Sequence, residues 1–140
     1  MKADLPKAVH EHRQRIERAI SCYTAQHMSN AKWRKLFSLL AEFRIYRMSW
    51  RFVASNDCLT TPYAPTSADL LEDGIRDGRF CPFAYREIES ITIPAHVEVH
   101  DRFGAFTRFH DLPEISASIG AAGQFCTSLD AAGLTIHGYS

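Results

Sequence analysis

Residues 29–43 read SNAKWRKLFSLLAEF, a stretch whose apolar side chains recur every three or four positions. This spacing places them along one side of a helix and leaves the charged side chains on the other. Ser29 stands just before the stripe, where a serine hydroxyl accepts a hydrogen bond from a free N–H of the first turn. We therefore predict a helix here whose buried stripe is formed by Trp33, Leu36, Phe37, Leu40 and Phe43.

The following stretch, residues 44–54, reads RIYRMSWRFVA and changes to a period of two. Aromatic and apolar residues at every second position, with arginines and a serine between them, predict a strand that buries one face. A second strand is predicted through Ile88, Ile91 and Ile93, closed by Pro94. From these segments we expect a core that contains Trp33, Leu36, Phe37, Leu40, Trp50, Phe52, Ile91 and Ile93.

The remaining chain supplies further elements around this centre. A helix is predicted from Pro6 to about Gln26, a hairpin over residues 96–112 with its turn at 101–104, and a short helix from Pro113 that Gly123 stops. Two last strands follow, joined by a turn at 130–133. We predict a single α+β domain, residues 1–140, in which two N-terminal helices pack on a mainly antiparallel sheet. Residues 1–28 form a helical extension of the main domain, 29–140.

The charges are balanced overall but unevenly distributed. The chain has 16 Lys and Arg against 16 Asp and Glu; residues 1–53 hold 11 and 4 of these, a balance of +7, which leaves −7 for residues 54–140. An isoelectric point near 7.0 argues against a dedicated nucleic-acid binder. Neither a membrane-spanning run nor a secretion signal is found in the sequence, and the four cysteines have no metal-finger spacing, so we expect a cytoplasmic chain with reduced thiols.

One short motif carries candidate metal ligands. His96, Glu98 and His100 alternate along a predicted strand, so their side chains share one face as the ligands of a metal site would. Val97 and Val99 alternate with them and explain the same pattern as a strand with one buried and one solvated face. We therefore expect no cofactor and keep a metal-dependent enzyme at this site as the alternative.

Acidic residues gather in the segment between the two predicted strands. They lie among turn-forming residues in a stretch expected to be a surface loop, where carboxylates can meet a basic partner or simply solvate the loop. The candidate partner-binding residues are Asp57, Asp69, Glu72, Asp73 and Asp77.

Three blocks carry a family resemblance: MSNAKWRKLFSLL at 28–40, DGRFCPFAYREIESITIP at 77–94 and GLTIHGYS at 133–140. Together they resemble a family of small bacterial α+β proteins of unknown function, which implies kinship but neither an activity nor a site. In size and class the chain is also similar to bacterial immunity proteins, which neutralise toxins. We therefore expect a non-catalytic, cytoplasmic protein-binding domain, an immunity protein whose partner is a toxin.

Overall fold

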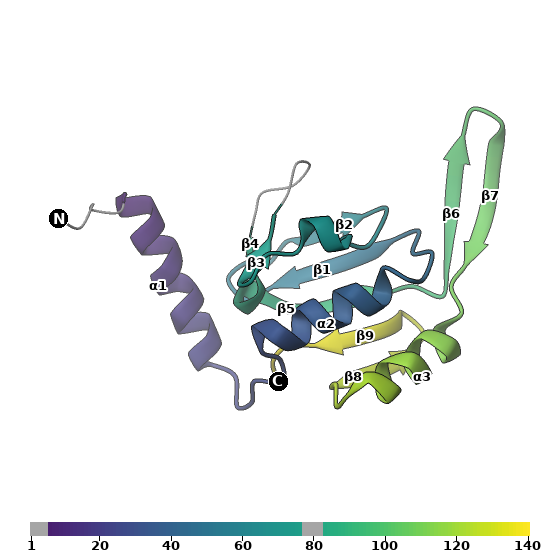
Figure 1. Ribbon diagram of the computed structural model, residues 1–140. Coiled ribbons are helices and arrows are strands. Elements are labelled where there is room, and N and C mark those ends of the chain that lie inside the picture. The colour runs from purple at the N-terminus through teal and green to yellow at the C-terminus, as the bar shows by residue number, and fades with distance from the viewer. Residues whose placement is uncertain (1–5, 77–82) are drawn as a thin grey trace.

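The computed structural model describes residues 6–76 and 83–140 and contains an antiparallel sheet with two helices over one face and the N-terminal helix beside one end (Figure 1). Two short 3-10 turns, Ser67–Asp69 and Tyr85–Glu87, interrupt the loops between strands. The helices are α1 (Lys7–Ser21), α2 (Asn30–Leu40) and α3 (Leu112–Ala122). The strands are β1 (Met48–Phe52), β2 (Cys58–Thr61), β3 (Gly74–Ile75), β4 (Phe83–Ala84), β5 (Ile88–Ile93), β6 (His96–Asp101), β7 (Gly104–Phe109), β8 (Thr127–Asp130) and β9 (Gly133–His137).

The main sheet has five strands in the order β2-β1-β5-β9-β8, and each neighbouring pair is antiparallel. Trp50 on β1 pairs with Ile91 on β5, which in turn pairs with Ile136 on β9. Because side chains alternate between the two faces of a strand, these three lie in one row on the same face. That row is fully buried and forms the centre of the core.

Helix α2 covers this apolar row, because its stripe of large side chains faces the sheet. The ring of Phe37 lies 5.4 Å from that of Trp50 and 5.5 Å from that of Trp33. Ser29 caps the helix as predicted, with its hydroxyl accepting from the N–H of Lys32 at 3.1 Å. Lys35 on the outer side of α2 donates to the carbonyl of Ala122 at the end of α3, which places α3 beside α2. Both helices therefore close the same face.

The predicted α+β class is confirmed, together with the short helix before the last strands and those two strands. The predicted hairpin is also present; it ends at Phe109, because α3 begins at Leu112. Helix α1 ends at Ser21 instead of near Gln26. The residues after it pair with the end of the chain, with the N–H of Thr24 and of His27 donating to the carbonyls of Ser140 and Gly138. This edge pairing satisfies backbone groups that a longer helix would have used.

Phe52 is half-buried, although we expected it in the core. The register between β1 and β5 shifts between Arg51 and Phe52, as at a β-bulge. Phe52 therefore lies past this break, as the last residue of β1, a strand whose C-terminal end points toward α1 (Figure 1). The other seven predicted core residues are buried.

A buried histidine that the sequence did not single out joins three segments of the fold. His110, between β7 and α3, accepts the N–H of Tyr46 on Nε2 at 2.9 Å and bonds the carbonyl of Pro94 through Nδ1 at 2.6 Å. A backbone N–H can only donate, so Nε2 is unprotonated and Nδ1 carries the hydrogen. This imidazole fixes the chain where it enters β1 and where it leaves β5.

Replacing His110 by Ala should lower the free energy of unfolding by about 2–4 kcal/mol, because each buried polar group left unpaired costs about 1–3 kcal/mol. Denaturant unfolding of the two proteins measures the difference. The matched control is His100→Ala on the exposed side of β6, which should change the free energy by less than about 0.5 kcal/mol. Equal effects of the two substitutions would contradict the structural role given to His110.

Candidate functional site

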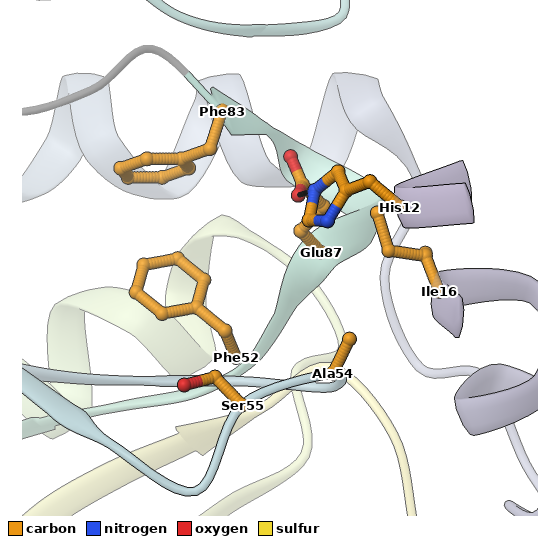
Figure 2. Close-up of a pocket in the computed structure, with 7 residues that line it drawn as sticks. All are labelled: His12, Ile16, Phe52, Ala54, Ser55, Phe83 and Glu87. Atoms are coloured by element: carbon orange, nitrogen blue, oxygen red, sulfur yellow. Dashed lines mark hydrogen bonds and ion pairs between the residues drawn. The ribbon is translucent and has the colours of Figure 1, made fainter. Parts of the chain in front are cut away.

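A groove separates α1 from the end of the sheet that carries Phe52, and we call it the α1 groove (Figure 2). It encloses about 270 Å³. Its walls come from α1, from the loop that follows β1 and from the turn between β4 and β5, three segments far apart in the sequence. The lining residues are His12, Ile16, Phe52, Ala54, Ser55, Phe83 and Glu87.

Helix α1 is held against the body by side chains on one of its faces. Ile16 is the buried residue of the helix, and His12 lies one turn before it, so both face the groove. Beyond the helix, Tyr23 donates to the carboxylate of Glu89 at 2.7 Å and stacks on Tyr139 with ring centres 5.2 Å apart. These contacts fix the C-terminal half of α1 and so define the width of the groove.

A histidine–carboxylate pair spans the groove. Nε2 of His12 lies 2.8 Å from Oε1 of Glu87, while the second oxygen of Glu87 accepts the N–H of Ala84 at 2.7 Å. The carboxylate is only 15% exposed and the imidazole 49% exposed, so the glutamate is the fixed partner and orients the ring. Such a pair holds a protonated imidazole, or a neutral one with Nδ1 free to accept a hydrogen bond.

The floor of the groove is aromatic. The rings of Phe52 and Phe83 meet edge to face with centres 4.8 Å apart, and Phe83 makes a second edge contact with Trp50 at 5.5 Å. Ser55 also lines the groove, but its hydroxyl accepts the N–H of Asp57 at 3.1 Å and points away from His12 in Figure 2. The groove therefore offers an apolar surface beside an oriented histidine and does not form a serine–histidine pair.

A second, more polar hollow of about 480 Å³ adjoins the groove and shares His12, Ile16 and Glu87 with it. Charged residues of both signs line it. Arg86 forms an ion pair with Glu17, whereas neither Arg13 nor Asp73 has an ion pair among residues 6–76 and 83–140. The hollow gives the apolar groove a charged margin.

The structure gives different roles to the four predicted acidic residues that it describes. Asp69 uses its carboxylate to accept from the N–H and the hydroxyl of Thr66, both at 3.0 Å, and so stabilises the turn at 67–69. Asp57, Glu72 and Asp73 are exposed, with Asp73 lining the polar hollow and Asp57 bonded to Ser55 at the groove. Asp77 lies outside the described residues.

The loop that carries Glu72 and Asp73 is held in place by the body. Arg34 of α2 donates to the carbonyl of Glu72, and the N–H of Tyr85 donates to the carbonyl of Asp73 at 3.0 Å. The Tyr85 hydroxyl also donates to the carbonyl of Leu71 at 2.8 Å. The pKa of Tyr85 is raised, chiefly by burial. The positive charge of Arg34 offsets part of this rise, and the negative charge of Asp73 adds to it. The two carboxylates are thus presented on a fixed backbone.

The metal alternative gains no support from the geometry. His96, Glu98 and His100 are exposed on β6, and Nε2 of His100 lies 3.9 Å from Oε2 of Glu98. Within the two described stretches of the chain, no three His, Cys, Asp or Glu side chains gather as metal ligands would. The alternation with Val97, which is buried, matches a strand with one solvated face.

Sequence reasoning missed the groove, because His12 and Glu87 are 75 positions apart and no local pattern joins them. The available signal was the helical spacing of His12, Ile16 and Tyr23, which marks the face of α1 that meets the body. Nothing in the sequence indicated which segment would meet that face.

Comparison of the chain with models of known protein families, with curated proteins and with solved structures finds no match. The family resemblance of the three sequence blocks stays a prediction. None of the helices in the described stretches is both long and apolar enough to cross a membrane.

Tyr23 makes the attachment of α1 sensitive to alkaline pH. Its burial, followed by the hydrogen bond and negative charge of Glu89, raises its pKa from 10.0 to about 12. A pKa raised by folding means that the stabilisation is fully present below pH 10 and is lost as the pH rises through about 12. We expect hydrogen exchange in residues 7–21 to accelerate across this interval by more than the base-catalysed rise that an unfolded chain shows.

The matched variant for this prediction is Glu89→Gln, which removes the charge and keeps a hydrogen-bond acceptor. It should lower the pKa of Tyr23 and shift the acceleration of exchange to lower pH. The tyrosinate absorbance of the wild type, compared with that of Tyr23→Phe, identifies the titration of this one hydroxyl. Identical pH profiles for the wild type and Glu89→Gln would contradict the role of this carboxylate.

Proposed function

We propose that this chain is a non-catalytic, cytoplasmic protein-binding domain that receives a segment of its partner in the α1 groove. The observation that carries the proposal is the combination of an aromatic floor, Phe52 and Phe83, with a margin of charged side chains. Protein interfaces have this organisation, in which a few aromatic contacts supply most of the affinity and a polar rim surrounds them.

On the side of the loop at 72–73 the charges beside the groove favour a basic segment of the partner, whereas Arg13, unpaired within the described residues, lies on the α1 side. Glu17 and Glu87 are already paired with Arg86 and His12. Glu72 and Asp73 form no ion pair among residues 6–76 and 83–140, and both are exposed. Negative side chains that are not neutralised within the protein attract a positive surface and accelerate its approach.

The specific form of this function that we propose is immunity: the partner is a bacterial toxin, which binding neutralises. This step is supported by the similarity in size and class to immunity proteins and by the acidic residues at the groove. A toxin with a basic surface would place a Lys or Arg near Glu72 and Asp73 and an apolar side chain against Phe52 and Phe83.

The test uses the product of the neighbouring reading frame as the partner and measures its association by biolayer interferometry. The double variant Glu72→Lys, Asp73→Lys should slow association about tenfold at low salt, and added salt should weaken the native complex. Asp69 is left unchanged because its carboxylate stabilises a turn. The control is Glu42→Lys, an equal kind of charge reversal on an exposed residue past the far end of α2.

The unfolding midpoints of both variants are compared with that of the wild type, so that a loss of folding is not taken for a loss of binding. Cells that express the neighbouring product should survive only with the wild-type chain or Glu42→Lys. A complex that forms equally fast with all three proteins would overturn the α1 groove as the site. Absence of any complex with the neighbouring product would overturn the immunity proposal.

A further inference from the structure

Strands β6 and β7 form a two-stranded arm, residues 96–109, that extends away from the main sheet (Figure 1). All six residues of β7 are exposed. Six large apolar side chains are exposed in the described part of the chain, and three belong to this arm: Phe103, Phe106 and Phe109, with exposed fractions of 78%, 38% and 74%. The arm therefore concentrates apolar surface outside the core and outside the α1 groove.

The outer edge of β7 is open. Within residues 6–76 and 83–140, β7 pairs with β6 alone, so every second residue directs its N–H and C=O away from β6. Strand β6 is partly covered at its root, where Val97 is buried. Proline and lysine, which protect exposed edges, are absent from β7, and its one charged side chain, Arg108, lies over the rings of Tyr46 and Phe106, so the edge can still accept another strand.

The two faces of the arm differ in chemistry. Phe106 and Arg108 share one face, where the Arg108 guanidinium lies over the ring of Phe106 at 5.2 Å and over that of Tyr46 at 5.6 Å. Ala105, Thr107 and Phe109 share the other face. A strand added to this edge must therefore present side chains that complement Phe106 and Arg108 on one face and Ala105, Thr107 and Phe109 on the other.

We propose that β7 pairs antiparallel with β7 of a second copy, about a two-fold axis at Thr107, to form a continuous four-stranded sheet. Residues that pair across strands lie on the same face, so the axis must pass through one residue of β7. With the axis at Thr107, Phe106 lies opposite Arg108 of the second copy, and Phe109 opposite its Ala105. Each Arg108 guanidinium then reaches the Phe106 ring of the other copy, and the large ring of Phe109 meets the small side chain of Ala105.

The neighbouring registers are less complementary. An axis at Arg108 would set two guanidinium groups against each other. An axis at Phe106 would place Arg108 opposite Gly104, which has no side chain to contact. The register at Thr107 also brings together residues beyond the two ends of β7. Phe103, at the tip of one arm, lies opposite Asp111, just before α3 of the other copy. Each arm tip thus reaches the root of the other arm, which accounts for the exposed ring of Phe103.

The first test measures molar mass in solution by size-exclusion chromatography with light scattering. The wild type should have twice the 15.9 kDa mass of one chain. Thr107→Lys brings two positive charges together on the axis and should give the monomer. The matched control, Leu129→Lys, places the same charge on β8, the exposed edge of the main sheet, and should leave the dimer intact. A monomeric wild type would overturn the proposal, as would a dimer that only Leu129→Lys dissociates.

The second test fixes the register by disulfide formation, in a chain whose four native cysteines are replaced by serine. Thr107→Cys should form a cross-linked dimer on mild oxidation, because directly opposed residues have Cβ atoms about 4.5–5.5 Å apart. Ala105→Cys is the control, since two copies of residue 105 would be separated by four residues, roughly 13 Å along the strands. Equal cross-linking of the two variants, or none at residue 107, would overturn this register.

Discussion

Stacking of α2 on the sheet through Phe37 is the interaction on which the rest of the structure depends. Among residues 6–76 and 83–140, the fully buried ring of Phe37 has three aromatic neighbours, Trp33 at 5.5 Å, Trp50 at 5.4 Å and Tyr85 at 6.3 Å. These rings come from the helix, from the central part of the sheet and from the turn at 85–87. Aromatic side chains bury large areas and stack with defined geometry, so one cluster fixes the positions of three segments.

The geometry of the α1 groove depends on this aromatic cluster. Tyr85, held against Phe37, begins the turn that ends at Glu87, and the backbone of the same turn holds one carboxylate oxygen of Glu87 through Ala84. Glu87 then orients His12 across the groove. A side chain on α1 is thus positioned by the core, although α1 itself contributes only Ile16 to the buried residues. Binding of a partner in this groove would add to the few contacts that hold α1 to the body.

Much of the fold could be predicted from local patterns. The helical stripe from Trp33 to Leu40 and the alternation around Trp50 identify their buried faces because one element generates each pattern. The glycines of the closing motif GLTIHGY are visible in the sequence, but their cause is a contact with a distant strand: a Cβ at Gly133 would lie 2.2 Å from the carbonyl oxygen of Ile93, and one at Gly138 would lie 2.6 Å from that of Ile88. Both glycines are required by close approach of β9 to its neighbours.

The candidate site could not be predicted in the same way, because it depends on contacts between distant segments. His12 and Glu87, which bond across the groove, are 75 positions apart in the sequence. His110 and Tyr46, which are joined by the buried imidazole, are 64 positions apart. The predicted end of α1 was wrong for the same reason. The helix stops at Ser21 because the residues after it form backbone hydrogen bonds with the C-terminal residues, which the sequence around α1 does not reveal. Asp69 was predicted to bind a partner only because it lies in an acidic segment. In the structure its carboxylate accepts hydrogen bonds from Thr66 and stabilises the turn at 67–69.

Hydrogen–deuterium exchange of the chain, with and without the product of the neighbouring reading frame, tests most directly the claim that the α1 groove binds a protein. Amide exchange reports where a partner covers or orders the backbone. We predict slower exchange in the complex at residues 8–20, 52–57 and 83–87, which surround the groove, and unchanged exchange in β8. Protection confined to the β6–β7 arm or to β8, with the segments around the groove unaffected, would contradict this account.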